Sequence, residues 1–256
     1  MRHLSFFTGI GVFDLAAKTI GWTNVAAVEK DRRTAWFYLQ NHPETPIYGD
    51  IHTFPAADFR GAVDIVSGGD PCQPHSTAGK RLGQADPRFL WPEMLRCVEE
   101  CRPAWVVNEN VSGSLSTGSL DRKIDELEAA GYACWPPLLL SANAFGAAHI
   151  RERVFLVAHT QKGGFGTSYA ATLAREERAR STWQHGFNAL TERYAAGHTT
   201  IGGVLRAADG TAEGLHSYPR NGAIGALGNS IYFPTAVYIL SIVHHAHYGV
   251  WPGIKF

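Results

Sequence analysis

The first two thirds of the chain alternate between short apolar stretches typical of β-strands and longer stretches with helical periodicity. The strand-like stretches cover residues 2–7, 24–28, 63–66, 105–107 and 154–158. The segments expected to be helical lie between them, at 12–20, 32–41, 89–101 and 120–130. This alternation predicts an α/β fold with a doubly wound, mostly parallel sheet and helices on both of its faces.

In such a sheet, ligands bind at the carboxyl ends of the strands. In this chain, those ends carry small or chemically active residues, namely Gly9, Gly11, Glu29, Asp50, Cys72 and Glu109. Because parallel strands end at the same edge of a sheet, we expect these residues to converge on one site there.

Length and composition indicate how many domains the chain forms and where we expect it in the cell. The 256 residues fit one large domain, or one domain with a small lobe, and a hydrophobic fraction of 45% can fill a substantial core. No run of about 18 apolar residues predicts a membrane span. No signal peptide is evident at residues 1–10, so we expect a cytoplasmic protein.

The four cysteines lack the paired spacing of a zinc site, and no metal is expected. Cys97 and Cys101 lie four residues apart in a segment expected to be helical, where core filling is the better interpretation. Cys72 stands apart from the others because its surroundings are polar and rich in turn-forming residues.

Lysine and arginine together number 23, as do aspartate and glutamate, so the formal net charge is zero. This balance argues mildly against a nucleic-acid partner, but affinity depends on local charge and not on the sum. Residues 160–222 are rich in small and charged residues and have a slight basic bias, with seven lysines and arginines against five acidic residues. A closing apolar helix is expected at 232–248.

Residues 68–76 read Gly-Gly-Asp-Pro-Cys-Gln-Pro-His-Ser. Two glycines and two prolines hold Cys72 in a fixed loop at a strand end, whereas an inert cysteine prefers an apolar helix or strand. A thiol is a strong nucleophile toward an electron-poor ring, because even a small thiolate fraction near neutral pH reacts readily. The context predicts a reactive Cys72, with a buried structural cysteine as the alternative.

Three other signals are weak when taken one at a time. The Thr8-Gly9-Ile10-Gly11 turn lets a ligand approach the backbone, although it lacks the third glycine of the dinucleotide fingerprint and also fits an ordinary tight turn. Glu29 is placed to accept hydrogen bonds from ribose hydroxyls, or is a surface residue. Asp50 is placed to bind an adenine amino group, or is a turn residue.

Five short motifs, in order, resemble those of the cytosine-5 DNA methyltransferase family. Phe7-Thr8-Gly9-Ile10-Gly11 resembles the first cofactor motif, and Pro71-Cys72-Gln73 resembles the nucleophile motif. The further matches are Glu109-Asn110-Val111, Arg151-Glu152-Arg153 and the Gly-Asn motif at Gly228-Asn229-Ser230. Because they span most of the chain in the family order, they indicate a compact bacterial or phage-type member with a Rossmann-like methyltransferase sheet.

The resemblance implies methyl transfer from S-adenosylmethionine to carbon 5 of a cytosine that is flipped out of duplex DNA. Cys72 would attack carbon 6, and Glu109, with its pKa raised by partial burial, would protonate ring nitrogen 3. Arg151 and Arg153 would hold the carbonyl oxygen of the base. Without the other motifs, this arginine pair fits a surface salt-bridge face.

The resemblance also implies which residues bind the cofactor and the DNA. The cofactor pocket would be lined by Phe7, Gly9, Gly11, Glu29, Asp50, Ile51, Pro71, Leu90, Asn229 and Ser230. DNA would be contacted by Ser76, Lys80 and Arg81 in a mobile loop, and by Arg178 and Arg180. Read without the resemblance, Asn229 is a helix start and residues 75–81 are a basic surface loop.

The same resemblance divides the chain into three parts. Residues 1–159 would bind the cofactor and carry catalysis, 160–222 would form a small target recognition region, and 223–256 would return to the catalytic domain. A recognition region this short implies a short target or loose specificity.

Three residues depart from the family pattern. Asp70 stands where an uncharged residue is usual, His75 replaces an aromatic residue and His149 replaces a glutamine. A carboxylate that pointed toward the thiol would raise the thiol pKa, so we expect Asp70 to face away or to be paired with a cation.

Two other functions remain open from the sequence. One is cytosine-5 methylation of tRNA, and the other is nucleic-acid binding without catalysis, although intact Cys72, Glu109, Arg151 and Arg153 argue against the second. The chain fits either a restriction–modification pair or a solitary methylase, and no obligate protein partner is evident.

Overall fold

The computed structural model describes residues 1–71, 89–160, 188 and 231–254. Its centre is an eight-stranded sheet with the strand order β3-β2-β1-β4-β5-β8-β6, and β7 pairs with β8. The strands are β1 (Arg2–Phe6), β2 (Thr23–Val28), β3 (Ile47–Tyr48), β4 (Ile65–Gly68), β5 (Trp105–Val111), β6 (Tyr132–Cys134), β7 (Leu138–Ser141) and β8 (Glu152–Thr160). The first five in this order run parallel, whereas β8 is antiparallel to its neighbours β5, β6 and β7. The sheet is therefore mostly parallel with an antiparallel end, and the predicted fold class is confirmed.

The strand order reverses direction between β1 and β4. From β1 the chain builds outward to β2 and β3, then crosses back so that β4 pairs with the other side of β1. Ligands of doubly wound sheets bind outside the carboxyl ends of the strands at such a point. The carboxyl ends of β1 and β4 lead into Phe7 and Gly69, which places the turn of residues 7–11 beside the segment that leads to Cys72.

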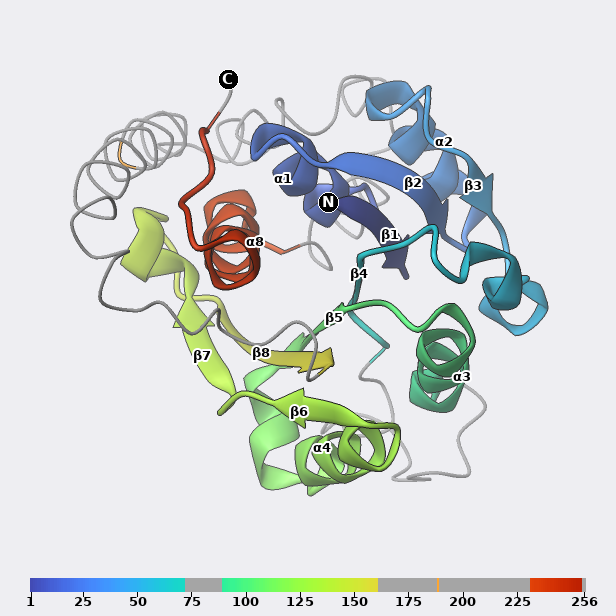
Figure 1. Ribbon diagram of the computed structural model, residues 1–256. Coiled ribbons are helices and arrows are strands. Elements are labelled where there is room, and N and C mark those ends of the chain that lie inside the picture. Colours follow the sequence, from blue (N-terminus) through green and yellow to red (C-terminus); the bar gives the residue numbers. More distant parts are fainter. Residues whose placement is uncertain (72–88, 161–187, 189–230, 255–256) are drawn as a thin grey trace.

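Helices cover both faces of the sheet (Figure 1). They are α1 (Val12–Thr19), α2 (Arg32–Asn41), α3 (Trp91–Cys101), α4 (Ser119–Ala129) and α8 (Phe233–Tyr248). One core cluster joins α1 and α8 to the face of β5 that carries Trp105 and Val107. The other joins α3 and α4 to the face that carries Val106. Because side chains alternate along a strand, Trp105 and Val107 of β5 lie in one core and Val106 lies in the other.

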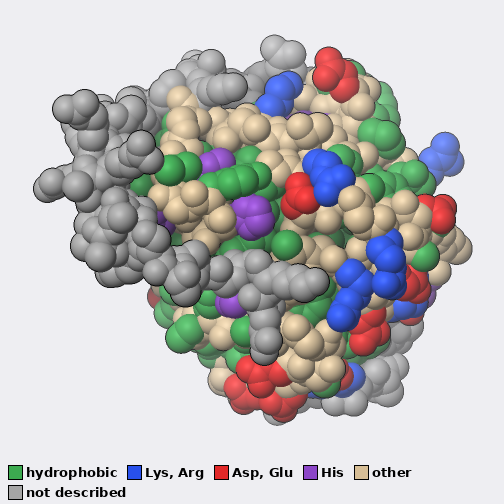
Figure 2. Space-filling model, viewed as in Figure 1, with side chains coloured by type: hydrophobic (Ala, Val, Ile, Leu, Met, Phe, Trp, Pro, Cys, Tyr) green, Lys and Arg blue, Asp and Glu red, His purple; other side chains and the backbone are tan. Residues whose placement is uncertain are grey.

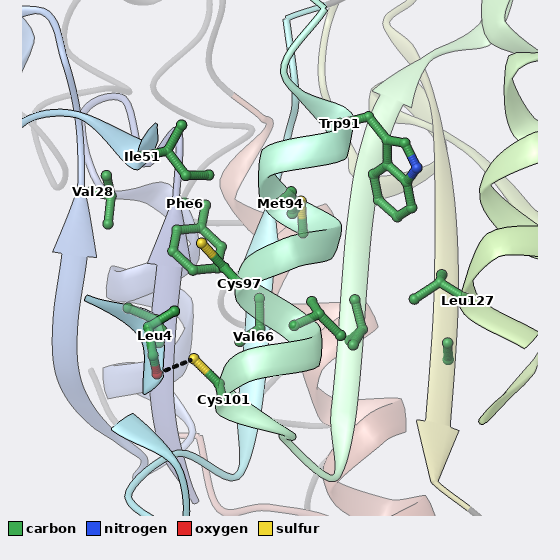
Figure 3. Packing of buried hydrophobic residues seen from close by; sticks show 14 of the residues in the cluster. Leu4, Phe6, Val28, Ile51, Val66, Trp91, Met94, Cys97, Cys101 and Leu127 are labelled. Carbon is green, nitrogen blue, oxygen red and sulfur yellow. Dashed lines mark hydrogen bonds between the residues drawn. The ribbon is translucent and has the colours of Figure 1, made fainter. Parts of the chain in front are cut away.

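The helix α3 shows how its sequence fixes its place. Met94, Cys97, Val98 and Cys101 recur at helical spacing, and all four are fully buried. They belong to the same buried cluster as Phe6 of β1 and Ile51, and Figure 3 shows Met94 and Cys97 on the side of α3 that faces Phe6. The prediction that Cys97 and Cys101 fill the core is confirmed, and burial raises the pKa of each thiol to about 12.

The helix α8 lies far along the chain yet packs against α1 at the start of it (Figure 1). Phe233, Val237, Leu240 and Val243 are buried in the same core as Ile10 and Phe13. The proposed boundaries of the three parts of the chain stay predictions, since the region 161–230 lies almost entirely outside the described residues.

Several element boundaries differ from the sequence-based expectation. The strand β5 continues through Asn108, Glu109 and Asn110 to Val111, where we expected it to end at residue 107. Asparagine and glutamate have low strand propensity, but β4 and β8 pair with β5 on both sides and tertiary pairing overrides that preference. The short strands β6 and β7 were not predicted, and α3 begins at Trp91 and not at residue 89.

Four short 3₁₀ segments complete the described elements. They are η1 (Ile51–Thr53), η2 (Ala56–Phe59), η5 (Ser112–Ser116) and η6 (Ala142–Phe145). Within the described ranges, no helix is long and apolar enough to cross a membrane. On the face shown in Figure 2, basic and acidic side chains lie over the right-hand and lower parts of the described surface, and hydrophobic and histidine side chains lie left of its centre.

Candidate active site

Glu109 lies near the end of β5 and is almost completely buried. It is paired in register with Phe155 of β8, so Arg153 is its diagonal neighbour on the same face of the antiparallel pair. Arg153 Nε donates to Glu109 Oε1 at 2.7 Å. The sheet thereby brings together two of the four residues predicted to be catalytic.

Burial raises the pKa of Glu109 to about 7. Arg153 and Arg151 oppose this rise by favouring the carboxylate, whereas the nearby charge of Asp70 adds to it. A carboxyl group with a pKa near neutrality holds a proton for part of the time and gives it up readily, which suits a general acid. The predicted direction of the shift is confirmed.

Arg151 immediately precedes β8 and is partly buried. Burial and the neighbouring charge of Arg153 lower the pKa of Arg151, while Glu109 raises it. Its carbonyl oxygen accepts a hydrogen bond from Ala142 at the start of η6. The three side chains of Arg151, Arg153 and Glu109 therefore form one charged group at this end of β5 and β8, and the arginine pair is not a surface salt-bridge face.

Gly69 follows β4 and lies directly beside Glu109. A Cβ atom placed on Gly69 would lie 2.5 Å from Glu109 Oε2. The absence of a side chain at residue 69 is therefore what allows the carboxylate to lie against the β4 end. This close approach explains the second glycine of the Gly-Gly-Asp-Pro-Cys segment.

Asp70 is buried and paired, as expected for a carboxylate next to the nucleophile motif. Lys123 Nζ, from α4, donates to Asp70 Oδ1 and also to Asn108 Oδ1, at 2.9 Å from the latter. Asn108 Nδ2 in turn donates to Asp70 Oδ1 at 2.9 Å. The charge of Asp70 is thus satisfied on the α4 side of the sheet.

The turn after β1 has the geometry expected of a ligand-binding turn. Phe7, Gly9 and Gly11 all have positive φ, of 51°, 59° and 86°. A Cβ on Gly9 would meet nothing within 4 Å, whereas one on Gly11 would lie 2.6–2.8 Å from the rings of His42 and Tyr38. Gly9 therefore leaves open space above the turn, and Gly11 allows the turn to pack on α2.

A buried carboxylate supports this turn from below. Asp14, in the first turn of α1, accepts hydrogen bonds from Thr8 Oγ1 at 2.6 Å, Ser5 Oγ at 2.9 Å and Tyr38 OH at 3.1 Å. These bonds tie β1, the turn and α2 together. Sequence reasoning missed Asp14, although an acidic residue inside an apolar helical stretch was a usable signal.

Glu29 follows β2 and reaches the turn. Its Oε2 accepts a hydrogen bond from Gly9 N at 2.9 Å, and its Oε1 accepts one from Asp31 N at 2.8 Å. Burial raises the pKa of Glu29. A carboxylate with remaining acceptor capacity beside an open glycine turn fits the ribose-binding role that the resemblance implies.

The remaining predicted cofactor residues are spread around this edge. Asp50 accepts from Lys30 Nζ and from His52 Nδ1, each at 2.8 Å, and these bonds lower its pKa. Ile51 is buried in the core beneath α3 (Figure 3). Pro71 and Leu90 are partly buried on either side of the gap in the described chain.

Several predicted residues lie outside the described residues, and their roles stay predictions. They are the nucleophile Cys72, the loop residues Ser76, Lys80 and Arg81, the recognition residues Arg178 and Arg180, and the cofactor residues Asn229 and Ser230, together with the departure at His75. His149 is described, is exposed and lies edge-on to the ring of Tyr232, with centroids 6.1 Å apart.

The residues at the ends of β1 and β2 fit S-adenosylmethionine. The open space above Gly9 admits a ligand against the backbone, and Glu29 offers an anion to hydroxyl groups at the same place. Among the described residues, no group of three or more His, Cys, Asp and Glu is arranged to hold a metal ion.

A family model described as C-5 cytosine-specific DNA methylase matches residues 1–213. The chain belongs to this family. The resemblance seen in the sequence motifs is therefore confirmed.

Individual Type II methyltransferases are also similar to this chain in sequence. Type II methyltransferase M.HgiBI of Herpetosiphon aurantiacus is 35% identical over 165 residues, 63% of this chain and 38% of that protein. Type II methyltransferase M.AquIA of Picosynechococcus sp. is 34% identical over 179 residues, 61% of this chain and 71% of that protein. The chain thus spans well under half of the first of these methylases.

Among solved structures, DNMT2 of Spodoptera frugiperda, in a mutant form, superimposes with a TM-score of 0.69 at 17% identity. The match covers 95% of this chain and 99% of that one. At this identity the match shows a common methyltransferase fold and nothing about substrate.

Proposed function

We propose that this methylase transfers a methyl group from S-adenosylmethionine to carbon 5 of cytosine in duplex DNA, by way of a covalent adduct with Cys72. The observation that carries the proposal is Glu109, buried at the carboxyl end of β5 and bound by Arg153 at 2.7 Å, with its pKa raised by burial to about 7. The family, described as cytosine-specific DNA methylases, supports DNA as the substrate.

The proposed reaction needs a nucleophile, a proton donor and a base. The thiolate of Cys72 adds to carbon 6 of the cytosine, and the ring must accept the electron pair. Glu109 in its protonated form donates a proton to ring nitrogen 3, so that the addition gives a neutral enamine with a nucleophilic carbon 5 and not a ring anion. After carbon 5 has been methylated, a base removes its proton and the thiolate of Cys72 is released.

Arg151 and Arg153 hold charge in place during these steps. Arg153 binds one oxygen of Glu109 through Nε, which leaves the other oxygen of the carboxyl group to carry the transferable proton. The second arginine offers guanidinium N–H groups to the carbonyl oxygen of the base. Both charges favour the thiolate form of a cysteine brought near them.

Gly9 and Glu29, with Phe7 and Asp50 nearby, would hold the cofactor. When bound, S-adenosylmethionine supplies a methyl group on a positively charged sulfur, which makes that carbon open to attack. The turn of Phe7–Gly11 positions the ligand against the backbone, and Glu29 accepts hydrogen bonds from its ribose. Asn229 and Ser230 are proposed to complete the pocket.

The cytosine must leave the duplex to reach Glu109. Extrusion costs a few kcal/mol, which pocket contacts and closure of the gap recover. We assign these contacts to Ser76, Lys80 and Arg81, and target reading to the segment 160–222 through Arg178 and Arg180. Each of these assignments rests on the family resemblance.

The test is methyl transfer from labelled S-adenosylmethionine to mixed-sequence duplex DNA and, in parallel, to tRNA. Wild type is compared with Cys72→Ala and Cys72→Ser, and with Cys134→Ser as a matched control at a partly buried cysteine away from the site. We expect 5-methylcytosine in DNA with wild type and the control, and none with either Cys72 variant. Transfer to tRNA alone would replace DNA by RNA as the substrate, and activity in Cys72→Ala would refute the nucleophile.

A further inference from the structure

On the side of the sheet opposite Glu109 lies a buried ion pair that the reaction itself does not use. Lys123 and Asp70 have side-chain exposures of 2% and 3%, so both charges are withdrawn from water. Lys123 comes from α4 and Asp70 from the segment just after β4. Buried pairs of this kind contribute little net stability compared with apolar residues, so a positional role is a reasonable explanation for one.

The pair is tied to the two residues that flank Glu109. Lys123 Nζ donates to Asn108 Oδ1 at 2.9 Å, and Asn108 Nδ2 donates to Asp70 Oδ1 at 2.9 Å. Asn110 Nδ2 also approaches Asp70 Oδ1, at 3.5 Å. Because side chains alternate along β5, Asn108 and Asn110 face α4 while Glu109 faces Arg153.

The lysine is held from a second direction. Its Nζ lies 4.9 Å from the centre of the Trp91 ring on α3, in cation–π geometry. Trp91 Nε1 donates to Glu126 Oε2 at 2.6 Å, and Arg122 Nε donates to the same carboxylate, at Oε1 and 2.7 Å. The ammonium group is therefore fixed between α3, α4 and the ends of β4 and β5.

We propose that Asp70 and Lys123 are positioning residues for Glu109. Their ion pair holds the end of β4 against the residues on either side of Glu109, and the Lys123 charge offsets part of the Asp70 charge that acts on Glu109. Gly69, one residue before Asp70, lies against Glu109 Oε2. A shift of Asp70 would therefore also move the Gly69 backbone that the Glu109 carboxylate contacts.

The charges that act on Glu109 are few enough to make this testable. Arg153 and Arg151 act from β8, and Asp70 acts from the β4 end. Lys123 Nζ is bound to Asp70 Oδ1 and to Asn108 Oδ1, so its positive charge lies beside the Asp70 charge and opposes its effect on Glu109. The effect on methyl transfer rests on the proposed function, but the effect on the titration of Glu109 does not.

The experiment uses the full chain with ¹³C-labelled glutamate carboxyls, and Glu109→Gln assigns the Glu109 resonance. The variants are Lys123→Met, Asp70→Asn and the double variant, with Lys18→Met as a control at an exposed lysine on α1. We expect the pKa of Glu109 to rise by about half a unit or more in Lys123→Met and to fall in Asp70→Asn. The double variant should return it close to wild type.

Activity is measured per cofactor-binding site, so that loss of folded protein is not counted. We expect kcat to fall roughly 10- to 100-fold in each single variant with KM for DNA nearly unchanged, and to recover in part in the double variant. If Lys123→Met does not fold, Asp70→Asn and the double variant still give the comparison. A Glu109 titration that stays at its wild-type position in the folded single variants overturns the proposal, whereas shifted titrations without methyl transfer in wild type would overturn the proposed function alone.

Discussion

Arg153 and Glu109 lie on neighbouring antiparallel strands and are joined by a 2.7 Å bond from Nε to Oε1, with both side chains largely buried. The arginine favours the carboxylate, yet burial outweighs it and leaves the pKa of Glu109 raised to about 7. The pair therefore holds a group that changes protonation near neutral pH in a fixed orientation. Much of what can be tested in this methylase follows from that balance.

Methyl transfer should depend on pH through Glu109. Because the step proposed for Glu109 needs its protonated form, kcat should decline as pH rises through about 7. Glu109→Gln should lower kcat by a factor of about 10² to 10⁴ and remove this alkaline decline. Single-turnover rates from pH 5.5 to 9 test both points, and a wild-type rate that is constant over the upper half of this range would exclude Glu109 as the acid.

Stability should show the same group with a definite sign. The folded-state pKa of Glu109 is raised above its ordinary value of 4.5, so the folded protein binds the proton more tightly than the unfolded chain does. The contribution of Glu109 to the free energy of unfolding is therefore largest below about pH 4. It decreases as pH rises toward 7, by about 3 kcal/mol in total. The free energy of unfolding of wild type and Glu109→Gln is measured in urea at pH 4.5, 6 and 8. As pH rises, the stability of wild type should fall relative to that of the variant. Parallel curves for the two proteins would contradict this.

Gly69→Ala should damage the site selectively. The added Cβ would lie 2.5 Å from Glu109 Oε2, so the carboxylate must move away from the β4 end. We expect kcat to fall about 10²-fold, because a displacement of about 1 Å at a reacting group costs that much. Gly49→Ala is the matched control, since a Cβ there meets nothing within 4 Å. Equal activity of the two variants would show that Glu109 tolerates displacement.

Substitutions at Gly9 and Gly11 should change different properties: Gly9→Ala should mainly weaken cofactor binding, and Gly11→Ala should mainly lower stability. A methyl group on Gly11 meets the rings of His42 and Tyr38 at 2.6–2.8 Å, so Gly11→Ala should lower the free energy of unfolding by about 2–4 kcal/mol. Gly9→Ala has free space and should cost only about 1 kcal/mol, for the positive φ. Its main effect should be weaker binding of S-adenosylhomocysteine, by about tenfold or more, measured by calorimetry. Unchanged affinity in Gly9→Ala would show that the cofactor does not bind at this turn.

Much of the fold was predictable because it rests on local patterns. Apolar stretches at strand length and helical spacing located β1, β2, α1, α2 and α8 to within a few residues. Short strands such as β6 and β7, and the polar end of β5, were not predictable, because their pairing with β8 and not their composition makes them strands.

The same division applies to the site. The order of the motifs identified the family and named Glu109, Arg151 and Arg153 before any contact was known. The pairing of Asp70 was expected, but its partner was not: Lys123 reads as an ordinary helix residue until its position between Leu120 and Leu127 is seen to face the core.

Periodicity and short motifs are properties of neighbouring residues, so the fold class, the family and the residue types that carry the chemistry could be predicted from them. Which side chains meet depends on the fold, which pairs Arg153 with Glu109, Lys123 with Asp70, and Glu29 with Gly9. These contacts join segments far apart in the chain, and they depend on strand register, alternation of faces and the burial that the whole sheet provides. The family resemblance implied a raised pKa for Glu109, but how far the pKa rises depends on the burial that the folded sheet provides.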